Sequence, residues 1–137
     1  MNFHIDIVSL RGSIYSGDAS ELILPSIEGE ITVLAKHMPM VTTLTVGEVV
    51  VKTPGDTIHL SIGKGVFSFS KGTGRLLIED EAFSDELSEE KILEAKKVAE
   101  ELIAKGVTGE EKTRAMYTLR KSLFDLKIVR RKKKRVF

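Results

Sequence analysis

The side chains best suited to chemistry are three histidines, His4, His37 and His59, and the acidic run Glu79–Glu81. The histidines are far apart in the sequence and form no HxxxH or HExxH spacing, which argues against a metal site. Glu79 and Glu81 would share one face of a strand, where paired carboxylates can perform acid–base chemistry. No nucleophile or histidine accompanies them, so a solvated segment between two structural elements is the better interpretation.

The glycine-rich segments IGKGVF and SKGTGR offer no phosphate site either. Neither matches the GxxxxGK[ST] pattern or opens a helix, so both are interpreted as turns. The chain has no cysteine and therefore no disulfide framework and no thiolate zinc site. The sequence thus predicts a protein that is not an enzyme and holds no metal or cofactor, and His4 and His59 are expected to line strands.

Charge is distributed unevenly along the chain. Residues 1–86 hold twelve acidic and six basic side chains, whereas residues 87–137 hold eight acidic and fifteen basic ones. An acidic part joined to a basic part indicates two units with different partners. The basic segment suits an acidic protein surface or a nucleic acid. Few aromatic residues interleave with its charges, which favours a protein, and a small basic-tailed module that binds nucleic acid or protein remains the alternative.

Hydrophobic periodicity divides the chain at the same place. Up to Phe83, apolar residues alternate with polar ones, as in Phe3, Ile5 and Ile7, and turn signals recur every 8 to 12 residues. Many short strands at that spacing predict an antiparallel β-sandwich or barrel over residues 1–84.

After Phe83 the period becomes helical. Ser88 is a suitable N-cap, Gly106 a suitable terminator, and Thr108 with Glu111 forms a capping box for a second helix. The pattern predicts an antiparallel two-helix hairpin with a basic tail over residues 85–137, so the fold class is β + α. The expected apolar stripes are Ile92, Ala95, Ala99 and Leu102 on the first helix and Met116, Leu119, Leu123 and Leu126 on the second.

No targeting or membrane-spanning pattern stands out. The stretch MNFHIDIVSL lacks both a basic n-region and a long apolar run, and no apolar segment approaches the ~18 residues of a membrane span. We expect no direct insertion into a membrane.

Several segments resemble one known family. FHIDIVSLRGSIYSG, EGEITVLAKHMPMVTTLTVGEVVV, HLSIGKGVFSFS, LLIEDEAF and LSEEKILEAKKVAEELI together resemble the epsilon subunit of the bacterial F-type ATP synthase, from about Phe3 to Arg131. The resemblance implies a non-catalytic subunit of the central rotor stalk, at the cytoplasmic face of the bacterial plasma membrane. Its partners would be the gamma subunit, the ring of c subunits and, with the hairpin extended, the alpha/beta hexamer. The extended hairpin would inhibit ATP hydrolysis.

The resemblance also assigns residues. Glu30, His37, Met38 and Pro39 would contact the c ring and gamma, although Ala35-Lys36 stand where the family usually has Pro-Gly. Some members bind ATP at the start of the first helix. Here that motif is degenerate at Leu87, Ser88, Lys91 and Ile92, and two further arginines of the site align with Val98 and Asp125, so no ATP binding is expected. The inhibitory basic face would comprise Arg114, Arg120, Lys121, Lys127, Arg130 and Arg131.

Overall fold

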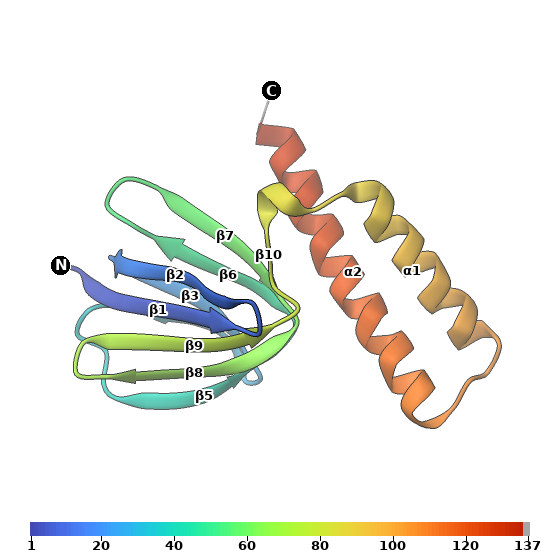
Figure 1. Cartoon of the computed structure of the whole chain (residues 1–137), viewed down its shortest axis with the longest axis horizontal. Helices are drawn as coiled ribbons and strands as arrows, with labels where there is room; N and C mark the ends of the chain where they lie inside the picture. The colour runs from blue at the N-terminus through green and yellow to red at the C-terminus, as the bar shows by residue number, and fades with distance from the viewer. Residues whose placement is uncertain (136–137) are drawn as a thin grey trace. The chain divides into compact units, whose positions relative to one another are not determined.

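The computed structural model describes the backbone of residues 1–135 and the side chains of residues 1–131. The chain divides into two compact units, Met1–Phe83 and Ser84–Phe137. The first holds the strands and the second the helices, which Figure 1 shows in chain order from blue to red. Each unit is described by itself.

The strands of the first unit form one sheet. Within the described residues there are ten strands, in the order β10-β7-β6-β3-β5-β8-β9-β1-β2, and β4 pairs with β3 beside this path. Their bounds are β1 Phe3–Ser9, β2 Gly12–Ala19, β3 Glu21–Ser26, β4 Gly29–Val33, β5 Met40–Leu44, β6 Gly47–Lys52, β7 Thr57–Ile62, β8 Lys64–Ser70, β9 Thr73–Glu79 and β10 Ala82–Phe83.

One pairing departs from the expected antiparallel pattern. Strand β1 runs parallel to β9, with His4 opposite Thr73 and Val8 opposite Leu77. The other strand pairs of the described residues are antiparallel. The two strands are far apart in the chain, so no hairpin turn signals their pairing. The predicted β-sandwich is confirmed, and one parallel pair stands among its antiparallel pairs.

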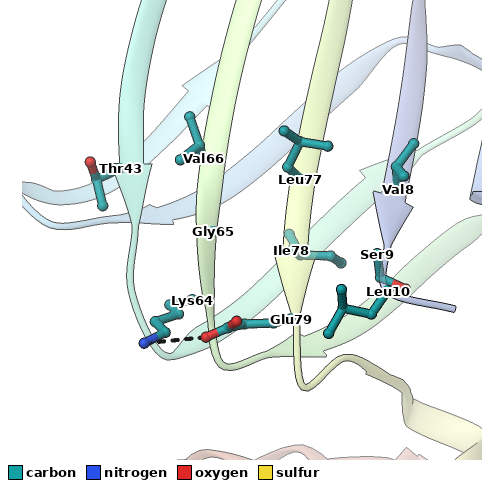
Figure 2. Close-up of a pocket in the computed structure, with 10 residues that line it drawn as sticks. All are labelled: Val8, Ser9, Leu10, Thr43, Lys64, Gly65, Val66, Leu77, Ile78 and Glu79. Carbon is teal, nitrogen blue, oxygen red and sulfur yellow. Dashed lines mark ion pairs between the residues drawn. The ribbon is translucent and has the colours of Figure 1, made fainter. Parts of the chain in front are cut away.

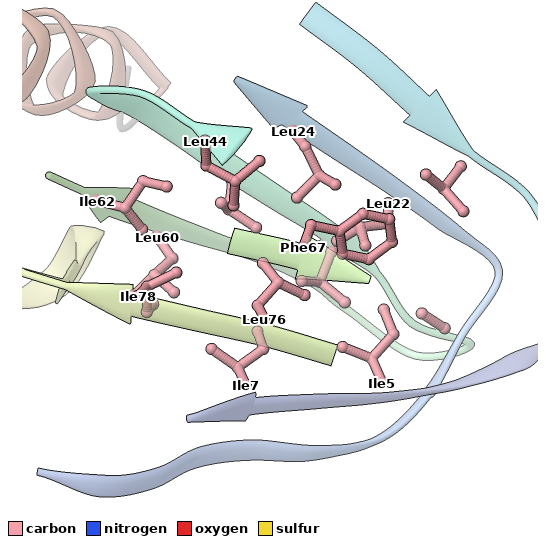
Figure 3. Packing of buried hydrophobic residues seen from close by; sticks show 14 of the residues in the cluster. Ile5, Ile7, Leu22, Leu24, Leu44, Leu60, Ile62, Phe67, Leu76 and Ile78 are labelled. Atoms are coloured by element: carbon pink, nitrogen blue, oxygen red, sulfur yellow. The ribbon is translucent and has the colours of Figure 1, made fainter. Parts of the chain in front are cut away.

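The sheet curls around a core built from the alternating apolar positions. Phe67, Leu60 and Leu76 are completely buried, and Figure 3 shows these side chains meeting between the strands. Phe3 and Phe69 pack edge to face, with ring centroids 5.6 Å apart. The core cluster comprises Phe3, Ile5, Ile7, Ala19, Leu22, Leu24, Val33, Leu44, Val49, Val51, Leu60, Ile62, Phe67, Phe69, Leu76 and Ile78. This unit therefore has a hydrophobic core of its own.

The second unit is the predicted helical hairpin. After a short 3-10 turn, η1 Ser84–Glu86, it contains α1 Glu89–Ala104 and α2 Gly109–Arg135. Ser88 caps α1 by accepting a hydrogen bond from the Lys91 amide, and Gly106 follows the helix with a φ of +80°. Both termini of α1 thus lie where capping chemistry predicts them.

The apolar stripe of α2 is rotated from its predicted position. Met116 and Leu123, two of its predicted members, are 48% and 50% exposed. Leu126 and Val129 are buried and pack with Ile92 and Leu87. The other buried positions among the described side chains of α2 are Ala115, Ser122, Asp125 and Ile128. Small side chains let two helices approach closely, so a seam can pass over Ala115 and Ser122 rather than over the larger residues beside them. On α1, Ile92 and Ala99 are buried and Ala95 is exposed.

Candidate protein-docking surfaces

The outer side of the sheet carries an exposed apolar surface. In β8 and β9 the inward side chains alternate with outward Val66 and Leu77, which are 44% and 61% exposed. On β1, Val8 points the same way, and Leu10 in the following turn is 96% exposed. We call Val8, Leu10, Val66 and Leu77 the apolar face. Exposed apolar groups gathered in one place, rather than scattered singly, mark interaction sites on soluble proteins.

Strand register brings the apolar face together. Leu77 lies opposite Val8 on one side and opposite Val66 on the other. Figure 2 shows Val66, Leu77 and Val8 in a row across neighbouring strands, with the Lys64–Glu79 ion pair away from this row at the adjoining ends of β8 and β9. They line a shallow hollow of about 510 Å³. Gly65 also lines this hollow. A larger residue does not fit there without a backbone shift, because a Cβ would lie 2.3 Å from the Leu77 carbonyl oxygen.

A polar cluster lies on β1 and β2 beyond the apolar face. The Ser16 hydroxyl donates to Asp6 Oδ1 at 2.7 Å, and His4 Nε2 lies 3.0 Å from the same oxygen. The hydrogen bond from Ser16, followed by that from His4, lowers the pKa of Asp6 below its ordinary value. Ser16 and His4 thus both point to the carboxylate. Ser16 Oγ also lies 3.4 Å from His4 Nε2, but its shorter bond directs the hydroxyl proton to Asp6. The arrangement therefore does not favour His4 as a base for the serine.

The predicted c-ring residues are distributed over two places. Glu30 is exposed on β4 next to the β3–β4 turn and lies opposite Pro25. His37 follows the other end of β4, in the loop before β5. Glu30 and His37 therefore lie at opposite ends of β4.

The loop around His37 presents apolar side chains. The His37 ring packs edge-on against Phe69, with centroids 6.1 Å apart, and its Nδ1 lies 2.8 Å from the Met38 carbonyl oxygen. Met38 is 72% exposed, and Pro39 is exposed next to it. The ring contact and the carbonyl contact fix the imidazole, so His37 shapes this loop rather than extending freely into solvent.

Most residues of the degenerate nucleotide motif, at the start of α1, have structural roles. Leu87 packs on the hairpin core, Ser88 caps the helix and Ile92 is buried in the seam. Lys91 is exposed and lines a hollow of about 630 Å³ between the two helices. Glu94 also lines the hollow from α1, and Glu111 and Arg114 line it from α2, so the lining carries both signs of charge.

The six predicted basic residues of α2 do not form one uniform face. Lys121 Nζ lies 3.0 and 3.1 Å from the carboxylate oxygens of Asp125, and Arg130 lies 3.5 Å from Glu89 on α1. Arg114, Arg120 and Lys127 are exposed, and Arg131 is half-buried. Part of the positive charge is therefore paired within the hairpin. The side chains of Lys132–Arg135, which complete the basic tail, lie outside the described residues.

Neither a metal-binding cluster nor a membrane-spanning helix occurs in the described part of the chain. Its His, Asp and Glu side chains form no group of three that could hold a metal ion. No helix in it is long and apolar enough to cross a membrane.

The acidic run Glu79–Glu81 differs from its prediction. Glu79 ends β9 and pairs with Lys64, but the side chain of Glu81 is only 5% exposed and bonds to Arg11. Calling the whole run a solvated segment was therefore wrong. Sequence reasoning missed this pair, since 70 positions separate its members. It also missed the apolar face, although Val66, Leu77 and Val8 occupy the outward positions of strands that alternate.

Comparison with known proteins gives one consistent family. Residues 2–80 match the family model of the ATP synthase delta/epsilon chain, β-sandwich domain. The chain is 34% identical to the ATP synthase epsilon chain of Nitrosomonas eutropha, over 97% of this chain and 96% of that one. It is 32% identical to the epsilon chain of a Psychrobacter strain, over 94% of each.

Solved structures share the fold at lower identity. A chain in the cryo-EM structure of the Euglena gracilis mitochondrial ATP synthase, OSCP/F1/c-ring, has a TM-score of 0.80 at 18% identity, covering 88% of this chain and 77% of that one. A chain of the Tetrahymena thermophila central stalk and c-ring has a TM-score of 0.65 at 12% identity, covering 92% and 95%. The family model and the nearly full-length relatives show that this chain belongs to the ATP synthase delta/epsilon family.

Proposed function

We propose that this protein is a non-catalytic subunit of the central rotor stalk of a bacterial F-type ATP synthase, coupling ion translocation to ATP synthesis. The apolar face is the observation that carries the proposal. A row of exposed apolar side chains on a rigid sheet suits a permanent protein partner and offers no chemistry of its own. By family resemblance, that partner is the gamma subunit.

The second contact of the sandwich would be with the ring of c subunits. Glu30, His37, Met38 and Pro39 are the residues that the family resemblance assigns to it, and all four lie at or near turns of the sheet. The exposed Met38 offers an apolar contact and Glu30 a charge. Binding to gamma and to this ring would place the protein peripherally at the cytoplasmic face of the plasma membrane.

The hairpin would act as the regulator of hydrolysis. Few large apolar side chains are buried between its two helices, where Ile92, Leu126 and Val129 form the buried cluster. Burying one Leu or Ile side chain fully stabilises by about 1.5–3 kcal/mol, so opening the seam costs several kcal/mol unless a partner covers the same side chains. Gamma would cover them in an extended state. The exposed cations of α2 would then meet an acidic segment of the catalytic beta subunit.

Nucleotide would not be needed for this regulation. Arginine binds phosphate through two parallel hydrogen bonds that lysine does not reproduce, and Lys91 stands where the family's motif has arginine. We expect no heat of ATP binding to the isolated protein at micromolar concentrations in a calorimetric titration. A micromolar dissociation constant would show that the hollow beside Lys91 accepts the nucleotide after all.

The assembly role is tested by co-purification. We would tag the full chain, purify it from membranes in detergent, and measure the amounts of alpha, beta and gamma that accompany it. Leu77→Asp places a charge in the middle of the apolar face and should remove these subunits. Leu93→Asp, at a 42% exposed apolar position on α1, is the matched control and should retain them. Equal recovery with both variants, at unchanged melting temperature, would show that the apolar face is not the docking surface.

A further inference from the structure

An ion pair joins the two ends of the curled sheet. Arg11 lies in the turn between β1 and β2, and Glu81 directly precedes β10. Arg11 Nε lies 2.6 Å from Glu81 Oε2, and Arg11 Nη2 donates to the Glu81 carbonyl oxygen at 3.2 Å. One guanidinium thus holds both the side chain and the main chain of Glu81, which a single point charge cannot do as well.

The position of this pair in the sheet is the second observation. Strands β2 and β10 stand at opposite ends of the strand order. Strand β10 has only two residues, Ala82 and Phe83, which pair with Ser61 and Leu60 of β7. So short a ladder adds few hydrogen bonds, and isolated strand pairs are marginal even when longer. Strand β10 therefore needs a further attachment on its N-terminal side, where Glu81 lies.

The environment of Glu81 supports such a role. Its side chain is 5% exposed, whereas that of Arg11 is 55% exposed. A nearly buried carboxylate is costly unless a partner compensates its charge. The preceding residue, Asp80, has a φ of +55°, so the chain turns sharply between β9 and the clamped residue. The arginine thus bonds to the residue that directly follows this turn.

We propose that Arg11 and Glu81 form a pin that keeps β10 on the sheet and so fixes where the connection to the helical unit begins. With the pin closed, the first unit extends to Phe83, and the 3-10 turn of the helical unit follows at once. With the pin open, residues 80–83 join the connection. At about 3.3 Å per residue, they add up to roughly 13 Å to the distance that the helical unit can reach.

The first test measures amide hydrogen exchange in the full chain. Arg11→Ala and Glu81→Gln should each speed exchange at Ala82 and Phe83 by about tenfold, while the amides of β6 and β7 remain protected. Lys64→Ala is the matched control, since it removes the more exposed Lys64–Glu79 pair, 3.3 Å apart, whose Glu79 lies only two residues before Glu81 in the chain. Arg11→Lys keeps the positive charge but lacks the planar guanidinium that bonds to two oxygens of Glu81, so it should speed exchange by less. This variant replaces Arg11→Ala if Arg11→Ala does not fold.

The rival explanation is that Phe83, which packs against the core, holds β10 by itself. If Arg11→Ala, Glu81→Gln and Arg11→Lys leave exchange at Ala82 and Phe83 unchanged while Phe83→Ala accelerates it, the pin is overturned. The same holds if Lys64→Ala accelerates exchange as much as Arg11→Ala.

The second test measures reach. Because the chain has no cysteine, spin labels can be placed through two introduced cysteines, at Val41 on β5 and Lys112 on α2, both exposed. Opening the pin with Arg11→Ala or Glu81→Gln should extend the long-distance limit of the label-to-label distribution by up to roughly 13 Å. Distributions that match the unmutated pair in both variants would show that the pin does not limit reach.

Discussion

The sandwich and the hairpin are stabilised in different ways. In the sandwich, Phe67, Leu60 and Leu76 are completely buried within a cluster that draws on nearly every strand. The buried cluster of the hairpin consists of Ile92, Leu126 and Val129. The sandwich thus holds its shape without help, and its exposed apolar face can serve as a permanent dock. The hairpin buries fewer large apolar side chains than the sandwich, so a partner that offers similar burial could take the place of one helix.

The largest difference should appear when each core is damaged. Phe67→Ala removes a completely buried ring and should destabilise the sandwich by about 3–5 kcal/mol. Leu126→Ala should cost about 2–3 kcal/mol and affect the protection of α1 and α2 only. Residue-resolved hydrogen exchange separates the two units. A general loss of protection in the sandwich after Leu126→Ala would break the comparison, because the units would then not be independently stabilised.

A smaller effect should follow at Gly65 in the sheet. A Cβ at this position would lie 2.3 Å from the Leu77 carbonyl oxygen, which is backbone and cannot move aside cheaply. Gly65→Ala should therefore destabilise the sandwich by about 1–3 kcal/mol in chemical denaturation. Gly55→Ala is the control, since a Cβ there meets nothing within 4 Å. Similar unfolding midpoints for the two variants would mean that the backbones of β8 and β9 move apart easily. The sheet beneath the apolar face would then not be rigid.

The hairpin should respond to loss of its cap. Ser88→Ala removes the acceptor of the Lys91 amide, a contact of 3.5 Å, and should cost about 0.5–1 kcal/mol, the lower part of the usual range for caps. Faster exchange confined to the first turn of α1 would sharpen the comparison, because the sandwich should not respond. Unchanged exchange in that turn would show that the long contact stabilises nothing.

The smallest effect on stability is expected at the proposed c-ring contacts. Glu30→Ala and Met38→Ala alter exposed side chains and should leave the melting temperature unchanged, while lowering proton pumping relative to ATP hydrolysis in the assembled complex. His37→Ala should behave alike in pumping and lose slightly more stability, because it gives up the contact with Phe69. Normal pumping in all three variants would remove these residues from the coupling surface.

Local chemistry made part of this structure predictable. Helix α1 begins directly after Ser88 and ends shortly before Gly106, as capping rules predict. The strict alternation of apolar and polar residues located the sandwich core. Contacts between distant segments could not be foreseen. No local pattern signals the parallel pairing of β1 with β9 or the contact of Arg11 with Glu81.

The α2 seam shows a second reason for error. Apolarity alone predicted Met116 and Leu123 as its members, whereas Ala115 and Ser122 are buried. The space available between two helices decides this, and that space depends on packing that a single helix does not encode.

The most direct test of the account removes the hairpin. Deleting residues 87–137 should leave the dock intact, so the complex should still assemble, and its ATPase activity should rise because the inhibitory element is gone. Replacing Arg114, Arg120, Lys121, Lys127, Arg130 and Arg131 by alanine should reproduce much of this rise, and added salt should mimic it by screening exposed charges. A truncated complex that assembles but hydrolyses ATP no faster than the full complex, across a range of salt, would contradict the central claim that the sandwich docks and the hairpin regulates.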